Sequence, residues 1–68
     1  MNNDEIKKII KIMSWADGGC EHCAMSLIKA FQKEFNLSKK LVKEITKEII
    51  KQEEHYWEVN LDDELFKQ

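Results

Sequence analysis

The two glycines of this chain are adjacent, at positions 18 and 19, and the sequence contains no proline. The chain as a whole is rich in lysine, glutamate, isoleucine and leucine, a composition that favours helices over strands. A glycine pair ends a helix because glycine adopts the left-handed cap conformation at little steric cost and permits a sharp reversal. Asp17-Gly18-Gly19 therefore predicts a tight turn between two helices.

Apolar residues recur at helical spacing in three segments of the chain. They predict helices at about residues 4–16, 20–35 and 39–54. Because the connections are only a few residues long, neighbouring helices are expected to run antiparallel or to cross steeply. The predicted fold is all-α, a compact three-helix bundle that forms a single domain over residues 1–68.

Polar residues before these segments predict the helix caps. We expect Asn3 or Asp4 to cap the first helix and Ser38 to cap the third. The residues expected to face the core are, in chain order, Ile6, Ile9, Ile10, Met13, Ala16, Cys20, Cys23, Ala24, Leu27, Ile28, Phe31, Phe35, Leu41, Val42, Ile45, Ile49 and Ile50.

The last part of the chain is an acidic tail that contains aromatic residues. Residues 1–52 carry ten lysines and seven acidic residues, whereas residues 53–68 carry six acidic residues and one lysine. We expect this tail either to form a short fourth helix or to fold back over the bundle. A chain of 68 residues lies near the size at which one core needs help from a metal, a disulfide or a partner.

The sequence shows no feature of a membrane or secreted protein. No apolar run approaches the roughly 20 residues that span a bilayer. The first residues also lack the basic and apolar pattern of a signal peptide. We therefore expect a cytoplasmic protein without a membrane partner, in which the two cysteines stay reduced.

Cys20 and Cys23 have the C-x-x-C spacing at which two thiolates can share one metal ion. Zinc is the expected ion, and it requires about four ligands. His55 reaches the thiols if the third helix brings its end back to them, and Asp17 or Glu21 offers a carboxylate oxygen. Alternatively, a homodimer joins two C-x-x-C pairs around one ion.

The sequence leaves two other interpretations of the cysteine pair open. The segment resembles the active sites of thioredoxin-like enzymes, particularly the Cys-Pro-His-Cys type, and Trp15 precedes it. That resemblance implies thiol redox chemistry, but the chain lacks the proline and the strand pattern of those enzymes. The simplest interpretation is that both thiols are small apolar residues packed at the helix junction, with no cofactor.

A row of lysines at i,i+4 spacing, Lys39, Lys43, Lys47 and Lys51, lies on the third predicted helix. Such a row can contact phosphates, so a small nucleic-acid-binding protein is one alternative. The chain has no arginine and a net charge of −2, which disfavours a nucleic-acid partner.

The acidic tail also fits a protein groove with a basic rim, because aromatic and leucine side chains anchor such contacts. The residues expected to bind a protein partner are Trp57, Leu61, Asp62, Asp63, Glu64, Leu65 and Phe66. Apart from the thiols, no set of residues predicts catalysis, so we expect no enzyme.

The segment Ala16-Asp17-Gly18-Gly19-Cys20-Glu21-His22-Cys23 follows an isoleucine- and lysine-rich helix. In this it resembles small helical proteins of phages and prophages in AT-rich Gram-positive bacteria. The resemblance implies a non-enzymatic protein-binding module. It further implies a phage-encoded inhibitor of a host or defence protein.

Overall fold

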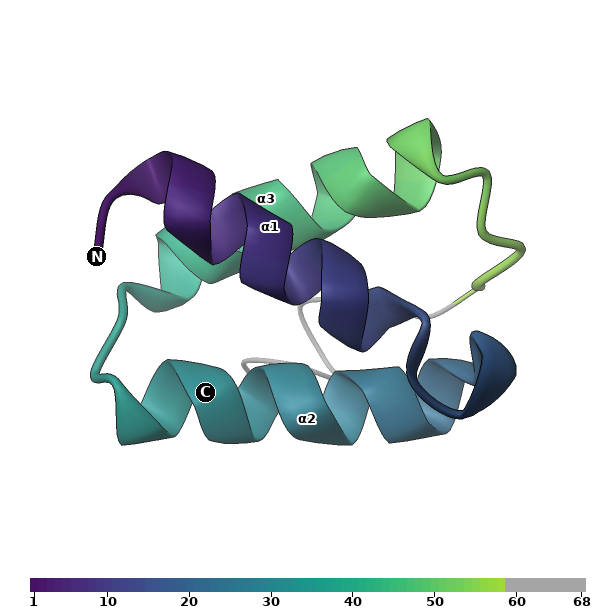
Figure 1. Ribbon diagram of the computed structural model, residues 1–68, viewed down its shortest axis with the longest axis horizontal. Coiled ribbons are helices and arrows are strands. Elements are labelled where there is room, and N and C mark those ends of the chain that lie inside the picture. Colours follow the sequence, from purple (N-terminus) through teal and green to yellow (C-terminus); the bar gives the residue numbers. More distant parts are fainter. Residues whose placement is uncertain (59–68) are drawn as a thin grey trace.

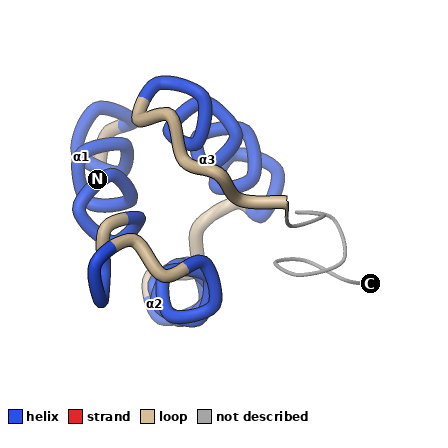
Figure 2. The backbone as a smooth tube through the Cα atoms, turned by 90° about the vertical axis from the view of Figure 1, so that its right-hand side faces the viewer, coloured by secondary structure: helices blue, strands red, loops and turns tan. Residues whose placement is uncertain are grey.

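The computed structural model describes residues 1–58, and these form three helices. They are α1 (Asn3–Ser14), α2 (Glu21–Glu34) and α3 (Lys39–Gln52), with a short 3-10 turn, η1 (Ala16–Gly18), between the first two. Consecutive helices run in opposite directions and surround one core (Figures 1 and 2). The predicted three-helix bundle is thus confirmed, and no strand occurs in the described residues.

Helices α1 and α3 each begin after a residue whose side chain accepts a backbone N–H group of the first turn. The Asn2 side chain accepts the N–H of Glu5 at 2.9 Å, and the Glu5 carboxylate accepts the N–H of Asn2 at 3.1 Å. This reciprocal capping box starts α1 at Asn3, so the prediction of Asn3 or Asp4 as the cap is wrong. Ser38 caps α3 as predicted, accepting the N–H of Leu41 at 3.3 Å.

Left-handed residues end α2 and α3 slightly earlier than the sequence predicts. Asn36 and Glu54 have φ values of 51° and 54°. The residue after each donates its N–H back into the helix, His55 to the Ile50 carbonyl at 3.1 Å and Leu37 to the Gln32 carbonyl at 2.9 Å. These bonds form the Schellman arrangement, which closes the helix and turns the chain away.

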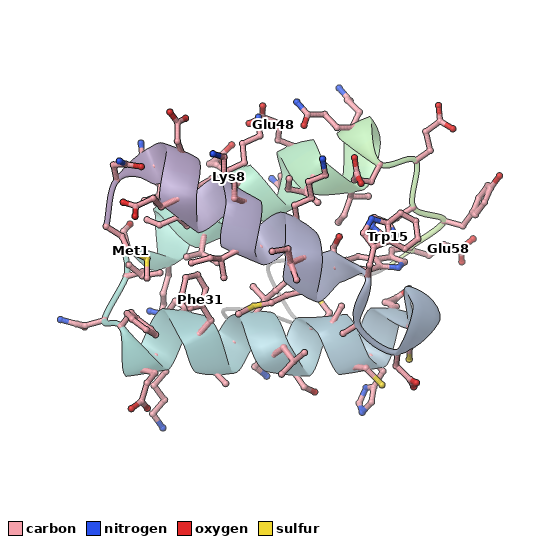
Figure 3. All side chains as sticks on the ribbon, in the orientation of Figure 1. Met1, Lys8, Trp15, Phe31, Glu48 and Glu58 are labelled. Carbon is pink, nitrogen blue, oxygen red and sulfur yellow. The ribbon has the colours of Figure 1, made fainter. Side chains whose placement is uncertain are left out.

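The core lies between the three helices, and α1 packs against both of the others. Its members are Ile6, Ile10, Ala24, Met25, Ile28, Phe31, Val42, Ile45 and Ile49. Figure 3 shows the Phe31 side chain in this space between α1 and α2. The prediction was wrong for Leu27 and Phe35, which are 46% and 55% exposed, and it missed Met25. Cys20 and Cys23 are only half-buried and lie outside the core.

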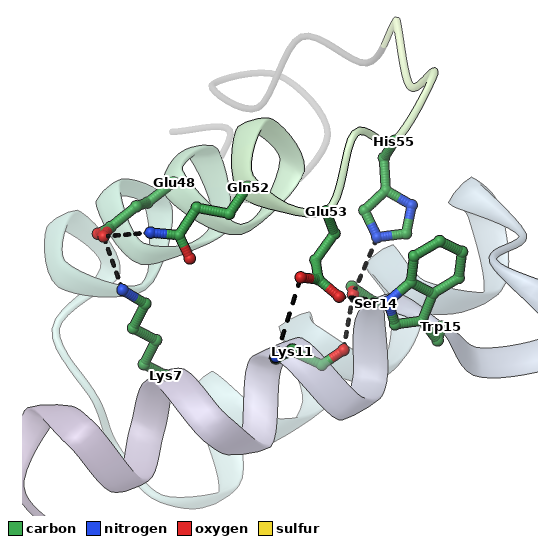
Figure 4. A network of polar contacts seen from close by, with 8 residues as sticks. All are labelled: Lys7, Lys11, Ser14, Trp15, Glu48, Gln52, Glu53 and His55. Atoms are coloured by element: carbon green, nitrogen blue, oxygen red, sulfur yellow. Dashed lines mark hydrogen bonds and ion pairs between the residues drawn. The ribbon is translucent and has the colours of Figure 1, made fainter.

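Two buried polar residues and two ion pairs complete the bundle. The buried hydroxyls of Ser14 and Thr46 donate to carbonyls one turn earlier in their own helices, at 2.6 Å and 2.7 Å. Between α1 and α3, Lys7 pairs with Glu48 at 2.7 Å, and Lys11 lies 3.9 Å from Glu53 (Figure 4). None of the helices in the described part of the chain is long and apolar enough to cross a membrane.

Two isoleucines of α1 test the assignment of the core. Ile10 is fully buried, whereas Ile12 is 74% exposed. We expect Ile10→Ala to lower the free energy of unfolding by about 2–5 kcal/mol, because it removes buried methyl groups and leaves a cavity. Ile12→Ala should change it by less than about 0.5 kcal/mol. Urea denaturation of both variants checks this, and equal effects would contradict the assigned core.

Candidate metal centre

The turn between α1 and α2 consists of three consecutive left-handed residues. Asp17, Gly18 and Gly19 have φ values of 53°, 73° and 91°. Aspartate tolerates this conformation better than most side chains, and glycine adopts it freely. The N–H groups of Gly19 and Cys20 donate to the Ala16 carbonyl at 3.1 Å and 3.2 Å, so the turn is internally bonded. The chain therefore enters α2 in a fixed direction.

The segment after α3 returns to this turn and covers it. The Trp57 indole N–H donates to the Gly19 carbonyl at 3.1 Å, and the Trp15 indole N–H donates to Glu53 at 2.9 Å. The His55 ring lies between the two indoles, with centroid distances of 4.1 Å to Trp15 and 4.3 Å to Trp57. We call these three residues the Trp-His-Trp stack. In Figure 1 the turn and the returning segment lie at the same end of the bundle.

His55 is held in the stack and is not brought to the thiols. Its Nε2 lies 3.0 Å from the Ser14 hydroxyl oxygen, as Figure 4 shows. Because Ser14 gives its own proton to the Lys11 carbonyl, His55 donates from Nε2. Burial lowers the pKa of His55 from its ordinary value of 6.5, and Glu53 partly opposes that shift. The histidine predicted as a zinc ligand thus serves to join α1 to the end of α3.

Two thiols and one carboxylate meet where the turn enters α2. One ligand atom each from Asp17, Cys20 and Cys23 lie within 4.8 Å of one another. Cys20 is the N-cap residue of α2, and Cys23 follows one turn later. The Cys23 thiol donates to the Asp17 carboxylate at 3.4 Å. Within residues 1–58 this is the group of ligand side chains close enough to share one metal ion.

The hydrogen bonds within the cluster shift the pKa values of its two thiols in opposite directions. The backbone N–H of Cys23, and after it the Cys23 thiol, stabilise the Cys20 thiolate and lower the pKa of Cys20 from 9.0. The hydrogen bond to Cys20 and then the bond to Asp17 raise the pKa of Cys23 to about 11. The Cys23 thiol holds its proton more tightly because its thiolate would face the Cys20 sulfur and the Asp17 carboxylate. A cation at the centre would reverse that preference.

The other predicted site residues lie elsewhere. Glu21 is turned to the returning segment, where its carboxylate accepts the N–H of Glu58 at 3.3 Å. Lys39, Lys47 and Lys51 are exposed on α3 and Lys43 is half-buried there. Trp57, which was predicted to bind a partner, packs against the core. The remaining residues predicted to bind a partner, Leu61, Asp62, Asp63, Glu64, Leu65 and Phe66, lie outside the described residues.

Comparisons of the chain with protein-family models, with curated proteins and with solved structures find no match. The resemblance of residues 16–23 to phage and prophage proteins therefore stays a prediction. What the site can bind follows from its own geometry and charge.

The two glycines differ in their surroundings, which gives a test of the turn. A Cβ at Gly19 would lie 3.0 Å from Trp15 Cε3, whereas a Cβ at Gly18 would meet no atom within 4 Å. We expect Gly18→Ala to lower the free energy of unfolding by about 1–2 kcal/mol, the cost of a left-handed alanine. Gly19→Ala should cost more, because it also displaces the indole. Thermal unfolding compares them, and a larger effect at Gly18 would contradict the described packing.

The lowered pKa of His55 predicts a pH-dependent stability. The unfolded chain binds the proton of His55 more tightly than the folded chain does. The contribution of His55 to the free energy of unfolding is therefore complete above about pH 6.5, and it is lost as the pH falls through the pKa of the folded state. The charged group that acts on the ring is Glu53, whose carboxylate lies 3.9 Å from the Lys11 ammonium. We expect the difference in Tm between the wild type and His55→Gln to shrink from about pH 7.5 to about pH 5. A difference that grows on acidification would show that the stack favours the charged ring.

Proposed function

We propose that this chain is a small zinc-binding protein, with Cys20 and Cys23 as thiolate ligands and Asp17 as a third donor. The observation that carries the proposal is that one ligand atom from each of the three residues lies within 4.8 Å of the other two. Zinc binds thiolates and carboxylates in tetrahedral sites, and C-x-x-C is a spacing at which two cysteines reach one ion. Thiolate ligands also favour zinc over magnesium or calcium.

The charge of the cluster supports this proposal. In the metal-free chain the pKa of Cys23 is raised to about 11, with Cys20 and Asp17 as the main causes. A divalent cation neutralises the crowded anions and deprotonates a coordinating thiol. The neighbours that keep the Cys23 thiol protonated in the absence of metal are therefore the ones that would bind a cation together with the Cys23 thiolate.

The surrounding bundle supports the proposal as well. The left-handed turn places Asp17 beside Cys23, and the bond from Trp57 to the Gly19 carbonyl holds this turn from the other side. A site that is formed before the ion arrives does not have to offset the entropy of ordering a loop. Zinc bound only to the folded state also stabilises a chain whose core is small.

Zinc titration of the metal-free protein tests the proposal. We expect Cys20→Ser and Cys23→Ser each to weaken zinc binding by more than about 100-fold, since each removes a direct ligand. His22→Ser is the matched control, because His22 lies between the cysteines, is exposed and is outside the cluster. Zinc at about 100 times its Kd should stabilise the fold by about 2.7 kcal/mol, seen as a higher Tm.

Cobalt gives an independent measurement of the same site. Co²⁺ bound to thiolates shows a near-ultraviolet charge-transfer band, which should appear with the wild type and with His22→Ser and be reduced in either cysteine variant. The proposal fails if zinc does not bind, or if it binds the cysteine variants as tightly as the wild type. A phage-encoded inhibitor, thiol redox activity and nucleic-acid binding through the lysine row each stay a prediction.

A further inference from the structure

Helix α2 carries a second apolar stripe that the bundle does not bury. Its members are Cys20 at the N-cap and then Cys23, Leu27 and Ala30. The thiols are half-buried, Leu27 is 46% exposed and Ala30 is exposed. The spacing of three, four and three residues places these side chains in one line along the helix. The stripe runs beside the buried face that Ala24, Met25, Ile28 and Phe31 present to the core.

Within the described residues, the candidate zinc site on this stripe has three donors, one fewer than a structural zinc site requires. The described residues supply three donors within 4.8 Å, and His55 is bound to Ser14 instead. A structural zinc site has four protein ligands, and sulfur ligands predominate in such closed sites. Ligands that complete a sulfur-rich site around the two thiols have to come from outside the cluster, on the side where the thiols are accessible.

We infer that a second copy of this chain completes the site, so that Cys20 and Cys23 of both copies hold one Zn²⁺ between them. The inference rests on the proposed zinc binding and names the partner at the same site. With the two-fold axis running parallel to α2, the thiol pair of each copy faces the same pair of the other copy, and the four sulfurs surround the ion. The second pair of thiolates takes the position that Asp17 would hold in a single chain.

The rest of the stripe fits this arrangement. Past the ion, Leu27 and Ala30 of one copy lie against the same residues of the other, as the a and d positions do in a parallel coiled coil. Contact between the copies buries the exposed Leu27, which explains an apolar side chain at this surface. A tetrathiolate zinc site carries a net negative charge, which the positive N-terminal ends of the two α2 helices stabilise.

Native mass spectrometry of the full chain, with Zn²⁺ added stepwise to metal-free protein, tests the inference. We expect saturation at one zinc per two chains, with the dimer absent when a chelator is present. Saturation at one zinc per monomer would overturn the dimer and leave zinc binding intact. Absence of bound zinc would overturn the proposed function and the dimer with it.

Two matched variants test whether the stripe forms the interface. Leu27→Glu leaves the ligands in place, and we expect it to weaken the zinc-bound dimer by about 10- to 100-fold, because each copy loses the burial of one half-exposed leucine. Ile12→Glu is the control, since Ile12 is 74% exposed on α1, away from the stripe. Circular dichroism of both variants should match that of the wild type. Equal dimer dissociation constants for the two variants would overturn the assignment of this face.

Discussion

The turn at Asp17-Gly18-Gly19 is the constraint on which the rest of this structure depends. Three successive left-handed residues reverse the chain so that α1 lies along α2. The same backbone path puts Cys20 at the start of α2 and Asp17 within reach of the Cys23 thiol. One backbone feature thus forms the core between the first two helices and gathers the ligand side chains. Glycine is favoured at the last position, where φ is 91° and a Cβ would lie 3.0 Å from the Trp15 side chain.

The segment that follows α3 makes this turn rigid. The Trp-His-Trp stack joins the end of α1 to the end of α3, and the Trp57 indole bonds to the turn itself. In a small domain the core alone gives limited stability, so contacts at the ends of the helices carry more weight. A zinc ion shared between two copies would add stability at the same end, because it binds only the folded chain.

The sequence predicts the three helices, the glycine turn and the Ser38 cap, because periodicity and capping chemistry are local. It does not predict which side of α2 faces the core, since apolar residues occupy two neighbouring stripes of that helix. Only packing against α1 decides that Met25 is buried and Leu27 is not. For the site, the spacing identifies both thiols and offers Asp17 as one donor. His55 reaches the stack because Glu54 adopts a left-handed conformation, and no feature of the sequence predicts that conformation.

The most direct test of the central claim is X-ray absorption fine structure at the zinc edge of the zinc-loaded protein. If Cys20 and Cys23 hold the ion together, the spectrum shows a shell of sulfur atoms at about 2.3 Å. That shell should decrease in Cys23→Ser. A shell that contains only nitrogen and oxygen at about 2.0–2.1 Å would contradict the assignment of these thiols as the metal ligands.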